Sequence, residues 1–366
     1  MIMIQYCVWG LVFLVTENGR VQGIEGENSF HSAFSGKYSI EARKIMRALS
    51  QNSRASISEI SAMAGISRKT AVKKMAALGE EFGVRHTIEF NEEKIGLVNP
   101  HLVLLKFKTK PDPESIADIL KKSHVPQLAV SMKGNYDMLI YANAASIREY
   151  VRWDKSTQIM LAEYGVYWQT SLVAHRQLGF FPLRTEALRR LNIDERERGM
   201  LSLLNSDARM SFKELASRMG MAQSTTIYNF EKLLGKGYVK RFTITMPPPK
   251  GLELMSFFSK YRSLSASFEH EAAQSRKVFM TDEQYPMVSK YLLCSQLVGS
   301  DDFFCLGSFD SHESAYKKDL AFYRKVHRKS NPRIFFGVVD KVVLGNLPIR
   351  SADVKEYDVI RWMPEI

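Results

Sequence analysis

The stretch RASISEISAMAGISRKTAVKKMAAL at residues 54–78 decides the fold, because a related stretch returns later in the same chain. That second stretch is RMSFKELASRMGMAQSTTIYNFEKL at residues 209–233, and the two align without a gap. Identical residues fall at Arg54/Arg209, Ser56/Ser211, Glu59/Glu214, Gly65/Gly220, Thr70/Thr225 and Leu78/Leu233. The apolar positions between them match in kind. The repeat therefore indicates two diverged copies of one structural unit.

A second pair of matching stretches closes each copy. LGFFPLR at residues 178–184 is matched by LGNLPIR at residues 344–350, with a wider separation than before. The second copy therefore carries insertions in its later half, which we place around residues 274–290. We expect two units, over residues 38–184 and 190–350.

The first part of each copy predicts a helix-turn-helix. In copy one, apolar residues at helical spacing lead up to Gly65, which suits a tight corner, and Ser67 is a natural N-cap for the next helix. Helix, helix, short glycine-containing turn and helix is the helix-turn-helix order. Residues 83–90 have the pattern of a short β-wing, and residues 237–245 repeat that pattern in copy two.

The later part of each copy predicts a β-α-β-β-α-β module, which is the ferredoxin-like arrangement. In copy one the expected strands and helices, in chain order, are residues 102–107, 113–122, 127–132, 137–141, 146–161 and 166–174. In copy two the matching segments are residues 255–261, 292–298, 303–308, 314–328 and 333–344. The expected fold class is therefore α+β.

The composition indicates a globular chain with an anionic partner. Of 366 residues, 45% are apolar and 25% are charged, which excludes a mostly disordered chain or a polytopic membrane protein. Lysine and arginine outnumber aspartate and glutamate by 51 to 39, giving a formal net charge of +12. Such an excess favours nucleic acid ahead of a membrane surface.

The cysteines and the N-terminus favour a cytoplasmic location. The three cysteines form no CxxC pair or disulfide framework, and the eight histidines lack zinc-site spacing, so we expect no metal and no cofactor. Residues 1–15 are almost wholly apolar, with Gln5 the one strongly polar side chain, but no basic residue precedes Arg20 and the run is shorter than the about 20 residues of a membrane-spanning helix. We interpret them as an extra strand or helix packed on the body, or as the product of a start codon placed too early. A membrane anchor is the less favoured alternative.

A winged helix-turn-helix followed by a βαββαβ module resembles the Lrp/AsnC (leucine-responsive/asparagine-regulator, feast/famine) family of bacterial and archaeal transcription regulators. Residues 193–204 resemble the family's opening helix, residues 211–221 its second helix and turn, and residues 65–78 its recognition helix. GNYD at residues 134–137 resembles the family's Gly-x-Tyr-Asp turn. The resemblance covers nearly everything after residue 37, twice over, whereas the usual family member has one unit.

The resemblance implies a domain plan. We expect two tandem copies of a winged helix-turn-helix, each followed by a ferredoxin-like module of the RAM or ACT type. The expected segments are an N-terminal extension (1–37), reader 1 (38–95), module 1 (100–184), reader 2 (188–246), module 2 (252–350) and a C-terminal tail (351–366). Family members usually dimerise through the βαββαβ module, so the two modules of one chain could pair as a built-in pseudodimer. Further self-association through these modules is also expected.

The recognition helix of reader 1 is the first candidate contact with double-stranded DNA. Major-groove reading needs cations for phosphates and amide or cationic forks for base edges. The candidate residues are Ser67, Arg68, Lys69, Thr70, Lys73 and Lys74. Lys69 and Lys73 lie one helical turn apart, so their charges could follow a phosphate backbone. The alternative is the solvated face of a helical hairpin.

The recognition helix of reader 2 carries amides and hydroxyls instead of cations. Its candidate residues are Gln223, Ser224, Thr225, Tyr228 and Asn229. Gln and Asn can bond adenine, but phosphate binding there would depend on neighbouring cations such as Arg209, Lys240 and Arg241. The alternative is that reader 2 has become a structural or dimerising module.

By the resemblance, the turn of Gly134, Asn135, Tyr136 and Asp137 belongs to a site for an amino acid or another small effector. A glycine turn exposes backbone N–H groups that can hold a carboxylate, and Asp137 could accept an ammonium group. A plain β-turn with glycine at positive φ is the alternative. Copy two has GSDD at residues 299–302, so a ligand there should differ or be absent.

Residues 317–333 are the segment richest in cations, and Asp319 is the only acidic residue in it. Its aromatic residues fall near helical spacing on the opposite face, which favours a core position for them. The cations could touch DNA, although a solvated face is the favoured interpretation.

No catalytic motif stands out, since the sequence has no G-x-S-x-G, no Walker A run and no G-x-G-x-x-G. We therefore expect a cytoplasmic, sequence-specific DNA-binding transcription regulator and not an enzyme. Siroheme decarboxylases resemble the chain in layout, but they have a histidine-containing stretch in place of residues 134–137, and no histidine lies near either turn. Such an enzyme, or an effector sensor acting through protein partners, is the alternative function.

Overall fold

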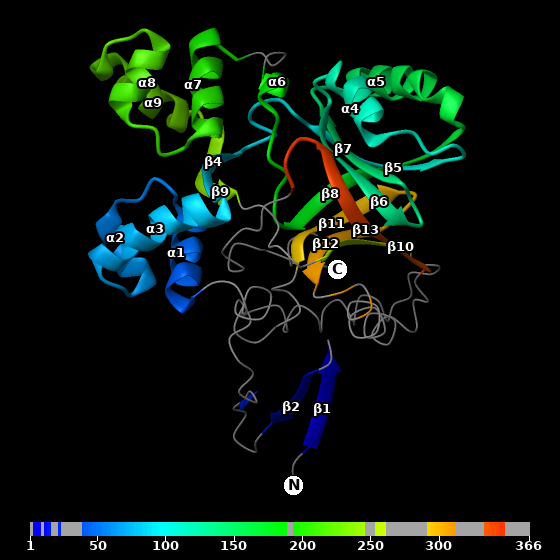
Figure 1. Cartoon of the computed structure of the whole chain (residues 1–366), viewed down its shortest axis with the longest axis horizontal. Coiled ribbons are helices and arrows are strands. Elements are labelled where there is room, and N and C mark those ends of the chain that lie inside the picture. The colour runs from blue at the N-terminus through cyan, green and yellow to red at the C-terminus, as the bar shows by residue number, and fades with distance from the viewer. Residues whose placement is uncertain are drawn as a thin grey trace, which may run out of the picture.

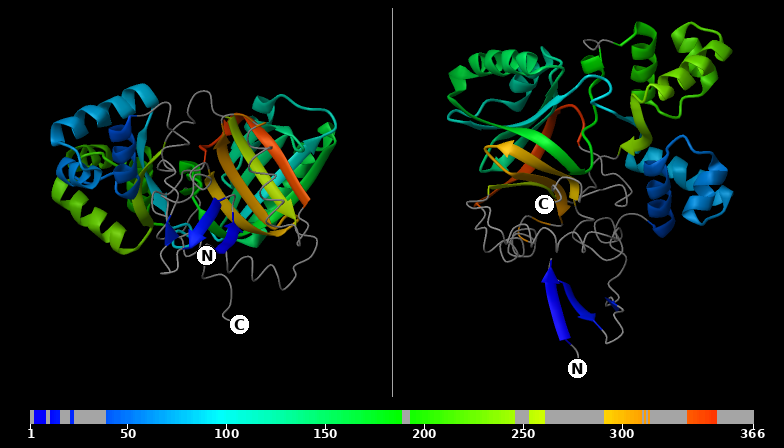
Figure 2. Two further views of the ribbon diagram at one scale, coloured as in Figure 1. Left: turned by 90° about the horizontal axis from the view of Figure 1, so that it is seen from below. Right: turned by 180° about the vertical axis from the view of Figure 1, so that it is seen from behind.

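A computed structural model describes residues 3–8, 11–15, 21–22, 39–188, 193–245, 253–260, 291–309, 311, 313 and 333–347. In these residues the chain is an α+β protein, with two helical groups on one side of a β-barrel (Figures 1 and 2). The insertion expected around residues 274–290, the helix expected at 314–328 and the tail lie outside the described residues. The same holds for the cation run, apart from Arg333.

Two groups of three helices and a strand have the same element order. The first is α1 (Ile40–Gln51), α2 (Ile57–Ala64), α3 (Arg68–Phe82) and β4 (Arg85–Phe90), and the second is α7 (Glu195–Ser206), α8 (Phe212–Met219), α9 (Gln223–Gly235) and β9 (Val239–Thr245). Ser56 and Ser211 cap α2 and α8 by accepting hydrogen bonds from the N–H groups of Glu59 and Glu214. Gly65 and Gly220 end these helices at φ 61° and 63°, a conformation that favours glycine.

The β-wings expected at residues 83–90 and 237–245 are present as strands, which pair with each other across the two copies. Each copy supplies a single strand, and β4 and β9 pair with each other in one antiparallel two-stranded ribbon between the helical groups (Figure 1). Ile88 of β4 packs in the core of α7, α8 and α9, while Ile244 of β9 packs in the core of α1, α2 and α3. The physical reason is burial, because each strand completes the apolar core of the other copy, leaving Ile88 1% and Ile244 3% exposed.

The barrel is built from the later parts of both copies. Its first half is β5 (Asn99–Phe107), α4 (Pro113–Lys121), β6 (Pro126–Gly134), β7 (Met138–Ala144), α5 (Ile147–Met160) and β8 (Val166–Leu178). Its second half is β10 (Glu253–Lys260), β11 (Tyr291–Gly299), β12 (Phe303–Phe309) and β13 (Arg333–Leu344). These elements match the segments expected from the sequence, within a few residues at their ends.

The eight strands close in the order β10-β12-β11-β8-β5-β7-β6-β13. Within this order, β8-β5-β7-β6 and β13-β10-β12-β11 repeat one strand pattern. The halves join at two antiparallel seams, β11 with β8 and β13 with β6. The edge strands of each half therefore pair with the edge strands of the other half, so a single chain closes the barrel.

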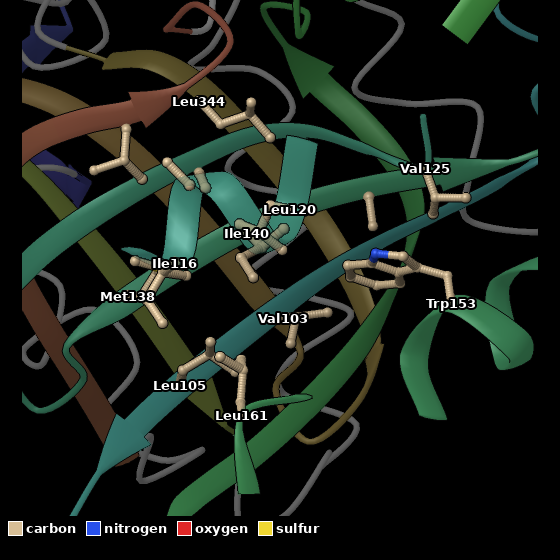
Figure 3. Close-up of a cluster of buried hydrophobic side chains, with 14 of the residues drawn as sticks. Val103, Leu105, Ile116, Leu120, Val125, Met138, Ile140, Trp153, Leu161 and Leu344 are labelled. Carbon is tan, nitrogen blue, oxygen red and sulfur yellow. The ribbon is translucent and has the colours of Figure 1, made fainter. Parts of the chain in front are cut away.

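Two apolar cores hold the barrel together. The inside is filled by side chains from both halves, with Tyr141 stacked on Phe181 at 3.7 Å and Phe258 against Phe304 at 4.7 Å between ring centroids. Outside, α4 and α5 cover the sheet of the first half. Figure 3 shows this second core around Val103, Leu105, Ile116, Leu120, Ile140 and Trp153.

The segment between β4 and β5 ties the ribbon to the barrel. Glu92 in this segment pairs with Arg176 of β8, and its carboxylate accepts hydrogen bonds from the Tyr141 hydroxyl at 2.8 Å and from the Asn143 amide. Burial raises the pKa of Tyr141 well above its usual value, with the charge of Glu92 acting in the same direction. Because the chain's own groups satisfy this buried carboxylate, the segment is tied to β7 and β8 of the barrel.

The N-terminal segment forms β-structure of its own. β1 (Met3–Val8), β2 (Leu11–Val15) and β3 (Val21–Gln22) make a three-stranded sheet. Among the described residues, no helix combines the length and the apolar character needed to cross a membrane.

Candidate nucleic-acid interface

The corner between α2 and α3 presents the cations of reader 1. Ser67 caps α3, and its hydroxyl accepts a hydrogen bond from the Thr70 N–H at 3.1 Å and lies 2.9 Å from the Thr70 hydroxyl. Arg68, Lys69 and Lys73 are exposed on α3, and none of them forms an ion pair with the residues that the structure describes. These three charges are therefore available to an anionic partner.

Lys74 has a different setting from the other predicted cations of reader 1. It is half-buried, and its Nζ donates a hydrogen bond to the Ser39 hydroxyl, the N-cap of α1, at 3.2 Å. Lys74 thus links α3 to the start of α1.

The α9 helix of reader 2 presents a neutral polar surface. Gln223, Ser224 and Thr225 are exposed in its first turn, and Tyr228 is 65% exposed. Ala222 is the N-cap and offers no side-chain hydrogen bond, in contrast to Ser67 in reader 1. Asn229 is half-buried, and its Nδ2 lies 3.7 Å from the Met221 sulfur. The structure thus exposes four of the five predicted residues and turns Asn229 back toward the corner.

The cations expected to assist reader 2 are engaged between the readers, so that expectation needs correction. Arg209 donates hydrogen bonds to the carbonyl oxygens of Ser53 at 2.5 Å and Ala55 at 3.0 Å. Arg241 and Lys240 both pair with Glu89 of β4, at 2.5 Å and 3.1 Å. The sequence repeat marked Arg209 as shared by both copies, but alignment carries no information about which atoms a side chain contacts.

The predicted effector turn is satisfied by groups of the chain itself. Asp137 accepts a hydrogen bond from the Phe107 N–H at 3.0 Å and pairs with Lys106 at 3.2 Å. Lys106 therefore occupies the place in which an effector ammonium was expected. Gly134 at φ 142° packs on β13, where an added Cβ would lie 2.6 Å from the Phe336 carbonyl oxygen. The turn seals the seam between β6 and β13.

Tyr136 of that turn points into the barrel and takes part in a buried polar chain. It is 7% exposed, and its hydroxyl donates to the Gln169 side-chain oxygen at 3.0 Å. Gln169 in turn donates to Asp301 at 2.6 Å. Burial raises the pKa of Tyr136 to about 12, with the charge of Asp301 as the second cause. Asp301 holds the position in copy two that Tyr136 holds in copy one.

Asp301 is the most perturbed acid among these residues. It is 1% exposed, one carboxylate oxygen has no hydrogen-bond partner among the described residues, and burial raises its pKa to about 6. Asp302 beside it pairs with Lys260 at 2.9 Å, repeating the Asp137–Lys106 pair of copy one. No group of three or more His, Cys, Asp or Glu side chains that could hold a metal occurs in the described part of the chain.

Comparison with known proteins matches this geometry. A family model for winged helix-turn-helix DNA-binding domains covers residues 193–240. An uncharacterised HTH-type transcriptional regulator of Pyrococcus abyssi is 31% identical over 78 residues, which is 21% of this chain and 49% of that protein. The HTH-type transcriptional regulator LrpA of Pyrococcus horikoshii is 34% identical over 58 residues, which is 16% of this chain and 41% of that protein. The chain thus spans less than half the length of either relative.

Among solved structures, the siroheme decarboxylase NirDL is similar to the chain over almost its full length. The match has a TM-score of 0.53 and covers 85% of this chain and 94% of that one, at 13% sequence identity. At this identity the likeness shows the fold alone.

These findings give the chain a winged helix-turn-helix DNA-binding domain at residues 193–240, in addition to its β-barrel. More narrowly, it shows homology to Lrp-type HTH regulators, and its repeated order of elements is consistent with two Lrp-like units in tandem.

Proposed function

We propose that the chain is a sequence-specific transcription regulator made of two tandem winged helix-turn-helix units, each followed by a ferredoxin-like module. The observation that carries this proposal is the α2–α3 corner, where a serine-capped helix presents Arg68, Lys69 and Lys73 without ion-pair partners among the described residues. Unpaired cations on such a helix fit the phosphates beside a major groove. A regulator of this type works on double-stranded DNA in the cytoplasm.

The two readers favour two unlike half-sites. The α3 helix offers cations, while α9 offers Gln223, two hydroxyl groups and the exposed Tyr228 ring. Cations bind phosphates of any sequence, whereas an amide fork and hydroxyls discriminate between base edges. In this proposal reader 1 supplies much of the affinity and reader 2 supplies more of the selectivity.

Selection of bound fragments from a random double-stranded DNA pool tests this function. We expect one asymmetric motif with two dissimilar halves, and an affinity that falls as salt rises. Retention of no fragment at physiological salt would leave the effector sensor that acts through protein partners as the better account. A palindromic motif would contradict the unlike readers but not DNA binding.

We further propose that a small effector such as an amino acid modulates binding from the turn at residues 134–137. Its support is the position of the turn on the β6–β13 seam, where a ligand that displaced Lys106 from Asp137 would act on both halves of the barrel. Thermal shifts against the twenty amino acids test it. A rise in melting temperature that Asp137→Asn abolishes supports the site, and the absence of any shift counts against an amino-acid ligand.

A siroheme-decarboxylase-like enzyme remains a second candidate, because the NirDL fold matches 85% of the chain. We propose that the chain is not such an enzyme, since residues 134–137 contain no histidine and the polar chain described inside the barrel, from Tyr136 through Gln169 to Asp301, contains none either. Titration of the purified protein with an iron tetrapyrrole tests the point. Saturable binding with a shifted absorbance band would favour the enzyme.

A further inference from the structure

Two short loops meet between the readers. Residues 52–56 join α1 to α2 in reader 1, and residues 207–211 join α7 to α8 in reader 2. Arg54 in the first loop donates hydrogen bonds through Nη1 to the carbonyl oxygens of Ala208 at 2.6 Å and Met210 at 3.2 Å in the second loop. Arg209 does the same in return.

The Nη1 of Arg209 reaches the carbonyl oxygens of Ser53 at 2.5 Å and Ala55 at 3.0 Å. Arg54 and Arg209 are equivalent in the repeat, and their contacts are reciprocal. The two loops are therefore related by an approximate internal two-fold axis. Each of them binds the loop of the opposite reader.

Further hydrogen bonds follow the same internal symmetry. The Ser53 N–H donates to the Phe242 carbonyl at 3.0 Å, and the Ala208 N–H donates to the His86 carbonyl at 3.1 Å. The Thr87 hydroxyl donates to the Asn205 carbonyl at 2.8 Å, and the Thr243 hydroxyl donates to the Ser50 carbonyl at 3.0 Å. Every one of these bonds crosses from one reader's strand or loop to the other reader, so the readers are joined as one body.

The joint is chemically unequal on its two sides. The Arg54 guanidinium lies 5.0 to 5.6 Å from the ring centroids of Phe212, Phe230 and Phe242, which is cation–π range. At the equivalent places around Arg209 the sequence has Ile57, Met75 and His86.

His86 does not replace the missing phenylalanine ring as a charged or well-bonded partner. Burial lowers the pKa of His86 to about 4, with the charge of Arg209 as the second cause, so the ring is neutral near pH 7. Its Nδ1 is buried without a hydrogen-bond partner among the described residues. The Arg54 side of the joint is therefore held by more contacts than the Arg209 side.

We propose that Arg54 and Arg209 form a reciprocal clasp that sets the distance and orientation between α3 and α9, and thereby the spacing of the two half-sites that one chain can bind. The clasp deepens the proposed function and rests on it. Burial lowers the pKa of both guanidinium groups, yet arginine keeps its charge at physiological pH, and the carbonyl oxygens compensate that charge. Both arginines act as positioning residues and not as phosphate ligands.

If the clasp fixes the two readers relative to each other, the DNA half-sites must have a fixed spacing. Because B-DNA turns once in about 10 base pairs, inserting about five base pairs between half-sites moves one of them to the opposite face of the duplex. Readers held as one body cannot follow that rotation, whereas loosely tethered readers can. The effect of the clasp is therefore measured as the ratio of the affinity for a correctly spaced site to the affinity for a wrongly spaced site.

The first test measures affinity for the selected DNA site and for versions with one to ten inserted base pairs. The natural chain should prefer its own spacing by about tenfold or more. Arg54→Met and Arg209→Met keep the apolar stem and remove the donors, so both should flatten the preference, Arg54→Met more strongly. Lys73→Ala, the control, should lower every affinity and leave the preference unchanged. Variants that melt cooperatively and keep the natural preference would overturn the clasp.

The second test needs no DNA and so separates failure of the clasp from failure of the proposed function. Ala62 and Ser217 are exposed and equivalent in the two copies, and Ala62→Cys with Ser217→Cys gives two spin-label positions once the three native cysteines are replaced by serine. Pulsed electron resonance should give one narrow distance distribution, broadened by Arg54→Met. A broad distribution in the unsubstituted arginine background would refute the clasp, while a narrow one without DNA binding would refute only the proposed function.

Discussion

Asp301 shows how one substitution between the copies changes the barrel at the scale of a residue. Its carboxyl group lies 1% exposed where copy one has Tyr136, and burial raises its pKa to about 6 from an ordinary value of 3.8. The folded state therefore holds a proton that the unfolded state releases between these values. Stability from the neutral acid is present below about pH 4 and is lost as the pH rises through about 6.

Replacement of Asp301 by Asn should remove the loss of stability that accompanies ionisation of this carboxyl group. We expect Asp301→Asn to raise the free energy of unfolding by up to about 3 kcal/mol at about pH 7.5 and to change it little at about pH 4. Urea denaturation at the two pH values measures both. Asp118→Asn is the control, because the Asp118 side chain is 73% exposed. An equal effect of Asp301→Asn at both pH values would rule out the buried charge as the cause.

Lys73 is the residue whose change reports most directly on phosphate contact. It is exposed on α3 and has no ion-pair partner among the described residues. Lys73→Ala should weaken DNA binding and reduce the slope of log K against log salt by about 0.9. Lys155→Ala on α5, also exposed, should leave the slope unchanged. A slope unaltered by Lys73→Ala would remove this lysine from the interface.

Residue roles were predictable where they depend on local pattern. Ser67 and Gly65 could be assigned as cap and corner because helix ends are set by the nearest few residues. Arg209 could not, since its partners Ser53 and Ala55 lie more than 150 positions away along the chain. Lys106 could not be predicted as the partner of Asp137 either, because the two residues lie 31 positions apart.

At the scale of elements, periodicity predicted the segments but not their partners. β13 begins and ends at Arg333 and Leu344, the bounds expected from the sequence. The β4–β9 pairing lies beyond such a pattern, because alternation tells which face of a strand is apolar and not which helices will bury it. Ile88 and Ile244 each pack in the helical core of the other copy.

This exchange of strands predicts an effect at a distance. Ile244→Ala in β9 should open a cavity beneath α1, α2 and α3, and destabilise the chain by about 2–4 kcal/mol. Hydrogen exchange should accelerate in α1 to α3, in the copy that does not carry the substitution. Ile88→Ala is the mirror variant and should accelerate exchange in α7 to α9. Acceleration confined to the substituted copy in both variants would contradict the exchange of strands.

At the scale of the whole molecule, one chain supplies both halves of the closed barrel. The seams β11–β8 and β13–β6 pair all four strands that would otherwise be free edges of the two half-barrels. Strand edges invite pairing with another chain, and a closed barrel removes them. The barrel thus gives no reason for a second chain at these edges.

It follows that a single chain should fill a complete DNA site. We expect a stoichiometry of one chain per selected duplex, measured by sedimentation or light scattering of the complex at concentrations well above the dissociation constant. A mixture of the chain with a version enlarged by a fused tag should give only two shifted bands in gel electrophoresis. A third band of intermediate mobility would mean that two chains bind one duplex together. A single chain would then not fill the site.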